Sequence, residues 1–121
     1  MIGTTQPTQI WMAAAAVDMR KSFDGLAEHV RAFLGHDPLS GQMFVFRNRS
    51  GERLKILWWD RDGLVLYYKR LEKGTFRFPT TDQKCIILDP RQLLQLLSGC
   101  QVERHQVVQR DFDELSRVAA G

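Results

Sequence analysis

The chain has 121 residues and a formal net charge of +3, and 44% of its residues are apolar, with 7 Phe, 3 Trp and 2 Tyr among them. This composition excludes an intrinsically disordered chain and a small protein held together by disulfides, and the length fits one compact domain. The longest apolar run, Ile10 to Val17, is far shorter than the roughly 20 residues of a membrane-spanning helix, so no membrane association is expected.

The first predicted elements are a strand and a helix. Residues 1–9 are polar, and we expect a flexible N-terminus. The segment that begins at Ile10 favours a strand because of Ile10 and Trp11, although its run of alanines is also typical of a helix. Ser22 is placed to cap the next helix, and Gly35 is placed to end it. Helical spacing predicts that one face of this helix is buried, made of Phe23, Leu26, Ala27, Val30, Phe33 and Leu34.

After a loop around Pro38, the apolar residues recur at every second position, which predicts three consecutive antiparallel strands. The segments "NRSG" (48–51) and "DRDG" (60–63) predict the two turns between them. One face of this meander is expected to be the core face, made of Phe44, Phe46, Leu54, Ile56, Trp58, Leu64, Leu66 and Tyr68.

Two short strands and a helix complete the predicted domain. The strands are expected at 75–78 and 84–88, and Asp89 followed by Pro90 predicts the start of a Leu-rich helix that stops near Gly99. The expected class is therefore α+β, with an antiparallel meander sheet of about five strands and a single domain over 10–99. The tail, 100–121, is predicted to form a helix through Val108, Phe112, Leu115 and Ala119, which either packs on its own domain or forms a homodimer contact.

The positive charge is concentrated in the middle of the chain. Residues 47–77 contain four acidic and nine basic residues, the latter being Arg47, Arg49, Arg53, Lys55, Arg61, Lys69, Arg70, Lys73 and Arg77. If one sheet face is the core, alternation places Arg47, Arg53, Lys55, Trp59, Tyr67 and Lys69 on the opposite face. Cations with interleaved aromatic rings suit nucleic acid, because cations neutralise phosphates and rings stack on bases. The alternatives are an ordinary solvated sheet face, or aromatic rings that lie beneath a second helix.

No pattern typical of catalysis is present. His29, His36 and His105 lack metal-ligand spacing, and Cys85 and Cys100 match no metal or redox motif. Neither a nucleophile elbow nor a phosphate-binding glycine loop occurs. We therefore expect no catalytic residue, no metal and no cofactor. The cysteines are expected to be reduced thiols of a cytoplasmic protein.

Two long segments resemble a known family. They are "VDMRKSFDGLAEHV" (17–30) and "DPLSGQMFVFRNRSGERLKILWWDRDGLVLYYKRLEKGTFRFP" (37–79), and the Leu-rich helix that follows fits the same pattern. Together they are similar to the accessory protein of the insertion sequence 66 family, called TnpB in those bacterial elements and unrelated to the RNA-guided nuclease of the same name. The resemblance covers roughly residues 10–98, and its motifs occur in the family's order.

The resemblance implies a role in transposition without catalysis, since the catalytic acidic residues of these elements belong to a separate transposase. The expected partners are DNA, either at the element ends or without sequence preference, the transposase, and another accessory protein of the element. The candidate DNA-binding residues are Arg20, Lys21, Arg47, Arg49, Arg53, Lys55, Trp59, Tyr67, Lys69 and Arg70. The alternative is an adaptor that docks on the transposase through Trp59, Tyr67, "MRKSFDGL" or the tail without binding DNA.

Overall fold

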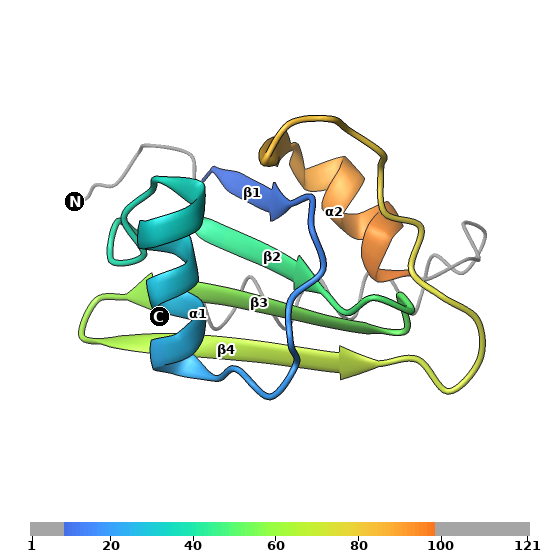
Figure 1. Cartoon of the computed structure of the whole chain (residues 1–121), viewed down its shortest axis with the longest axis horizontal. Helices are drawn as coiled ribbons and strands as arrows, with labels where there is room; N and C mark the ends of the chain where they lie inside the picture. The colour runs from blue at the N-terminus through green and yellow to red at the C-terminus, as the bar shows by residue number, and fades with distance from the viewer. Residues whose placement is uncertain (1–8, 99–121) are drawn as a thin grey trace.

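A computed structural model describes residues 9–98, and at its centre lies a five-stranded sheet with the strand order β4-β3-β2-β1-β5 (Figure 1). The strands are β1 (Ile10–Ala13), β2 (Met43–Arg47), β3 (Arg53–Asp60), β4 (Gly63–Arg70) and β5 (Cys85–Leu88). The helices are α1 (Phe23–His29), which continues directly into the π-helical η1 (Val30–Leu34), and α2 (Pro90–Leu97). The α+β class and the β2–β3–β4 meander are thus confirmed. The predicted tail helix lies outside the described residues and stays a prediction.

The sheet is mixed, and the prediction of a purely antiparallel sheet is wrong. β1 runs parallel to β2, with Ile10 opposite Met43, and antiparallel to β5, with Ile10 opposite Leu88. The helix between β1 and β2 explains this, because a helical crossover returns the chain to the same end of the sheet and so gives a parallel neighbour. The strand predicted at 75–78 is also wrong, since these residues belong to the long loop between β4 and β5.

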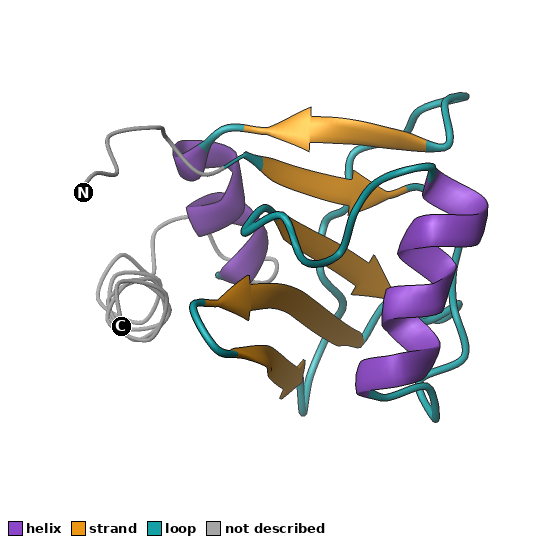
Figure 2. Cartoon of the chain, turned by 90° about the vertical axis from the view of Figure 1, so that its left-hand side faces the viewer, coloured by secondary structure: helices purple, strands orange, loops and turns teal. Residues whose placement is uncertain are grey.

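Both faces of the sheet are covered by helices, as Figure 2 shows. On one face, Leu26, Ala27 and Val30 of the first helix belong to one buried cluster with residues of β2 and β3. On the other face, Leu93, Leu96 and Leu97 of α2 form a second buried cluster with residues from β1, β2, β3 and β5. The interpretation of one sheet face as solvated is therefore wrong, and for Tyr67, which packs against the cluster beneath α2, the alternative of a ring under a second helix is confirmed.

The pairing of the strands also corrects the predicted core face. Residues directly opposite each other in an antiparallel pair project from the same face. Phe46 is opposite Lys55, and Lys55 is opposite Tyr68, so these three lie on the α1 side. Ile56 is opposite Tyr67, and both belong to the α2 side. The connection between β2 and β3 shifts the alternation by one residue, and a one-residue shift exchanges the two faces of a strand.

The first helix ends as predicted, but its buried stripe is narrower. Gly35 follows η1 with a φ of 74°, a left-handed conformation that glycine adopts without steric cost. Ser22 precedes the helix, but its side chain makes no capping hydrogen bond. Phe23 and Phe33, which were predicted to be buried, are 43% and 47% exposed. Within residues 9–98, no helix has the length and apolarity that crossing a lipid bilayer requires.

Helix α2 begins with a reciprocal cap. The Asp89 carboxylate accepts a hydrogen bond from the backbone N–H of Gln92 at 2.8 Å, and the Gln92 side chain accepts one from the backbone N–H of Asp89 at 2.8 Å. We expect Asp89→Ala to lower the free energy of unfolding by about 1 kcal/mol, measured by urea denaturation. The exposed loop residue Asp82 is the control, and equal losses in Asp82→Ala and Asp89→Ala would contradict the cap.

Candidate nucleic-acid interface

The cations of the middle segment gather at one end of the sheet. β2 ends at Arg47, β3 begins at Arg53 and β4 ends at Arg70. These three strands are neighbours, and Arg53 lies directly opposite Arg70. The antiparallel meander therefore brings cations that are far apart in the sequence to adjacent strand ends, at the right of Figure 1.

The loop that follows β4 adds further cations to the same place. Its backbone N–H groups at Leu71 and Phe76 donate to the carbonyl oxygens of Glu52 and Gly51, each at 2.9 Å. We refer to residues 47–53 and 70–78 together as the basic corner. It contains two acidic residues, Glu52 and Glu72, and six basic residues, Arg47, Arg49, Arg53, Arg70, Lys73 and Arg77. Its net charge of +4 exceeds the +3 of the whole chain.

Most of these cations are accessible. Arg49, Lys73 and Arg77 are exposed and have no hydrogen-bond or ion-pair partner among the described residues. Arg70 is also exposed and pairs with Glu72 at 3.1 Å. An exposed ion pair of this kind contributes about 0–1 kcal/mol, so a phosphate can replace the carboxylate at little cost.

The β2–β3 turn in the basic corner is held by its own side chains. The Asn48 side-chain oxygen accepts from the backbone N–H groups of Gly51 at 2.9 Å and Arg53 at 3.0 Å. Hydrogen bonds from the hydroxyl of Ser50 and the side-chain amide of Asn48 lower the pKa of Glu52 to about 2. Glu52 is therefore ionised at neutral pH, and Arg49 is carried on an ordered turn.

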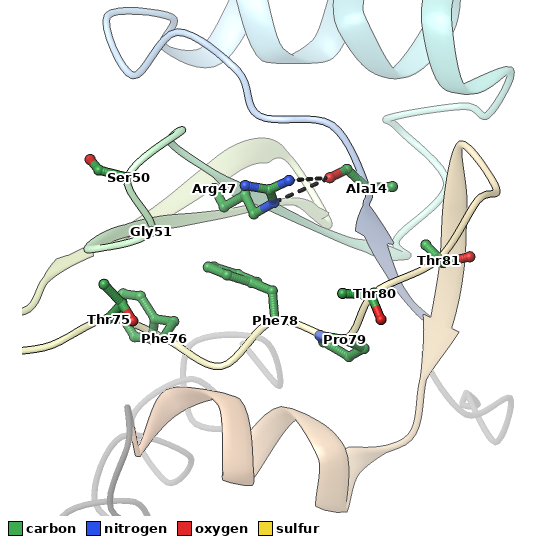
Figure 3. A pocket seen from close by; sticks show the side chains of 10 residues that line it. All are labelled: Ala14, Arg47, Ser50, Gly51, Thr75, Phe76, Phe78, Pro79, Thr80 and Thr81. Atoms are coloured by element: carbon green, nitrogen blue, oxygen red, sulfur yellow. Dashed lines mark hydrogen bonds between the residues drawn. The ribbon is translucent and has the colours of Figure 1, made fainter.

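A pocket of about 360 Å³ opens in the basic corner, which supplies six of the ten lining residues labelled in Figure 3. They come from the residue after β1, the end of β2, the β2–β3 turn and the loop at 75–81. The Arg47 guanidinium donates to the Ala14 carbonyl oxygen from Nε at 3.1 Å and from Nη2 at 2.8 Å. The same guanidinium lies 5.8 Å from the centre of the Phe78 ring. Four hydroxyl side chains complete the polar part of the lining.

Lys55 is used inside the fold. It is 5% exposed, and its Nζ donates to the carbonyl oxygens of Met19 and Lys21, both at 2.7 Å. The ammonium group also lies 4.5 Å from the centre of the Tyr68 ring. Because these contacts bury the cation beneath the segment that leads into α1, the predicted position of Lys55 on a solvated face is wrong.

Three other residues predicted on the solvated face are only partly accessible. The Lys69 Nζ donates to the Leu97 carbonyl oxygen at 3.1 Å, where a cation complements the C-terminal end of α2. Trp59 and Tyr67 are half-buried, and Tyr67 packs against the cluster beneath α2. They do not form the exposed aromatic surface that alternation predicted.

The remaining candidates, Arg20 and Lys21, are exposed and lie on the segment before α1. Arg20 forms a 2.7 Å ion pair with Asp18 and also donates its backbone N–H to that carboxylate. These hydrogen bonds lower the pKa of Asp18 to about 2. DNA contact by any of the ten candidate residues stays a prediction.

The ten candidate residues did not include Lys73 or Arg77, and the pocket was not predicted. Both cations are in the charged segment that the residue count identified, but they follow the meander and were not assigned to a sheet face. Phe78 was placed in a strand, whereas the loop turns its ring towards Arg47. The charge count was therefore a better guide to this site than the alternation.

The described residues contain no group of three or more His, Cys, Asp or Glu side chains that could hold a metal ion. Cys85 is a free thiol whose pKa is raised by burial. Burial, with a smaller contribution from the nearby charge of Lys21, lowers the pKa of His29. The His29 ring packs against Phe33 and Phe46, with ring centres 5.0 Å and 6.0 Å away, and Phe46 belongs to the buried cluster on the α1 side.

This environment of His29 predicts a pH dependence of stability. The pKa of His29 is lower in the folded chain than in the unfolded chain. As the pH falls below about 6.5, the unfolded chain therefore takes up a proton on His29 that the folded chain does not. Stability should therefore decrease as the pH falls below about 6.5 in wild-type protein, and decrease less in His29→Leu. Urea denaturation at each pH measures this difference, and parallel losses in the two proteins would contradict it.

Comparisons with known proteins give a consistent result. A family model described as "IS66 Orf2 like protein" matches residues 8–107. The chain is 42% identical over 99 residues to the uncharacterized protein y4hO of Sinorhizobium fredii (strain NBRC 101917 / NGR234), covering 82% of this chain and 86% of that relative. It is 35% identical over 99 residues to the uncharacterized protein y4jC of the same strain, covering 82% and 85%. No solved structure matches the chain.

Proposed function

The chain belongs to the IS66 Orf2-like family, whose members are accessory proteins of transposition, and on this premise we propose that it binds DNA through the basic corner without catalysing a reaction. The observation that carries this proposal is the convergence of six cations on adjacent strand ends, the β2–β3 turn and one loop, together with only two carboxylates. The exposed positions of Arg49, Lys73 and Arg77 support it further.

The proposed contact is with phosphates. Cations that neutralise phosphates release counterions, and this supplies affinity without reading the base sequence. Side chains on turns and loop ends reach a DNA backbone more readily than residues in the middle of a covered sheet. The protein would hold duplex DNA near the element ends and help the transposase to assemble there.

A binding titration tests this proposal. Wild-type protein is titrated into labelled element-end duplex and random duplex, each with and without the transposase. We expect both duplexes to bind without transposase at about 50 mM salt, and affinity to fall steeply as salt rises. Failure to bind either duplex at that salt concentration without the transposase would overturn direct DNA binding.

A second candidate function is an adaptor that docks on the transposase. Its support is a pair of exposed apolar side chains, Phe33 of η1, which is 47% exposed, and Ile87 of β5, which is 51% exposed. The Lys84 Nζ lies 5.4 Å from the Phe33 ring centre, which places the ring next to the segment entering β5. Co-purification with the transposase after nuclease treatment tests this function. Retention by wild-type protein and loss in Ile87→Ser would favour an adaptor.

A further inference from the structure

We propose that the pocket beside Arg47 holds one unpaired nucleotide of a DNA strand, with its phosphate on the Arg47 guanidinium and its base against the Phe78 ring. The inference rests on the proposed DNA binding and names the form of DNA that the site selects. A nucleotide within a duplex keeps its base stacked and paired, so only an unpaired one can present its face to a protein ring.

Arg47 supplies a fixed anion-binding group. Its hydrogen bonds to the Ala14 and Asn48 carbonyl oxygens use Nε, one N–H of Nη1 and one N–H of Nη2. One N–H on each terminal nitrogen is left, and two such donors match the oxygens of a phosphate. Because the Ala14 carbonyl already holds the guanidinium, little side-chain entropy is lost on binding. No acidic residue lines the pocket, so nothing there competes for this cation or repels an anion.

Phe78 supplies the apolar surface. Its ring is half-buried, its centre lies 5.8 Å from the Arg47 guanidinium, and the Phe76 ring is tilted against it at 56°, with the two ring centres 5.8 Å apart. Stacking of bases on aromatic side chains tolerates any base, since every base has a π-face. The pocket volume of about 360 Å³ is within the range of small-ligand sites.

The surroundings of the pocket suit the rest of a nucleotide. Thr75 and Thr80 are exposed on its lining, and a hydroxyl can both donate to and accept from a sugar or a base edge. Arg49 and Arg77 belong to the same basic corner and are exposed, so they can hold the flanking phosphates. A cation, an aromatic ring and neutral hydroxyls in one pocket fit a nucleotide better than a free inorganic anion, which would leave the ring unused.

The test compares a blunt duplex with the same duplex carrying a one-nucleotide extension. We expect wild-type protein to bind the extended duplex about tenfold more tightly, the scale of one stacked base. Phe78→Leu keeps the apolar packing but removes the ring, so it should bind the blunt and the extended duplex with equal affinity. Phe33→Leu is the matched control, because Phe33 is also an accessible ring with a cation above it, and it should keep the preference.

A nucleotide titration separates failure of this inference from failure of DNA binding. With deoxyadenosine monophosphate as the probe, we expect saturable changes in the NMR chemical shifts of the Gly51, Thr75 and Thr80 amides. Deoxyadenosine and inorganic phosphate should each bind at least tenfold more weakly than this nucleotide. Equal affinity for blunt and extended duplexes, or nucleotide shifts confined to residues outside the pocket, would overturn the inference. If the protein does not bind blunt duplex, only the proposed function is overturned. Saturable shifts of these amides with the nucleotide would still support nucleotide binding in the pocket.

Discussion

Replacing Lys55 with methionine is expected to lower the free energy of unfolding by about 2–3 kcal/mol, the scale of losing charge-assisted hydrogen bonds inside a protein. Methionine keeps the apolar stem but removes the donors for the Met19 and Lys21 carbonyl oxygens, each now bonded at 2.7 Å. Those carbonyls hold the segment that leads into α1 against β3, so the loss should also loosen the start of the helix.

Lys73→Met is the matched control for this change. Lys73 is exposed and makes no contact of this kind among the described residues, so its replacement should alter stability by less than about 0.5 kcal/mol. Denaturant titration of wild-type protein and both variants measures the difference. If Lys55→Met is as stable as Lys73→Met, Lys55 does not anchor the fold, and its original interpretation as a solvated phosphate contact would regain support.

Replacing Arg49, Lys73 and Arg77 together with glutamine is expected to weaken duplex binding on the order of 100-fold at about 0.1 M salt. Each of these side chains is exposed in the basic corner without a protein partner among residues 9–98, so each can neutralise one phosphate. Stability should change little, because the three side chains make no contacts that hold the described fold together. Fluorescence anisotropy with labelled duplex measures the loss.

The control removes the same charge from other surfaces. Arg31 lies in η1, Arg61 in the β3–β4 turn and Arg91 in α2, and all three are exposed. The triple glutamine variant of these residues has the same net charge as the basic-corner variant. Its affinity should fall by no more than about threefold if the corner is the binding site, since distant exposed charges are screened.

Much of the architecture was predictable because local patterns and turn signals agree with the final fold. The period of two and the two turn motifs predicted β2, β3 and β4, and Asp89 with Pro90 predicted the start of α2. The partners of β1 were not predictable from its own residues, because pairing is set by long-range packing. A strand followed by a helix and another strand is nevertheless a signal for a parallel crossover, and it went unused.

The site was less predictable, because it depends on register. Alternation places Lys55 and Trp59 on one face of β3, but cannot say whether a helix covers that face. The structure covers both faces and buries Lys55 at 5% exposure. The prediction that positive charge is concentrated in residues 47–77 identified the right segment. The accessible cations of that segment, however, lie at strand ends, in the β2–β3 turn and in the loop after β4. An exposed loop cation has no periodic pattern, so only the folded geometry shows that the loop carrying Arg77 is hydrogen-bonded to the turn carrying Arg49.

The most direct test of DNA binding by the basic corner is the slope of the logarithm of the association constant against the logarithm of salt concentration, measured with one duplex. Each lost phosphate contact lowers the magnitude of this slope by about 0.9. The slope of the variant that lacks Arg49, Lys73 and Arg77 should therefore be smaller in magnitude than the wild-type slope by about 2.7. The Arg31, Arg61 and Arg91 variant should keep the wild-type slope. Equal slopes for the two triple variants would contradict the assignment of DNA binding to this corner.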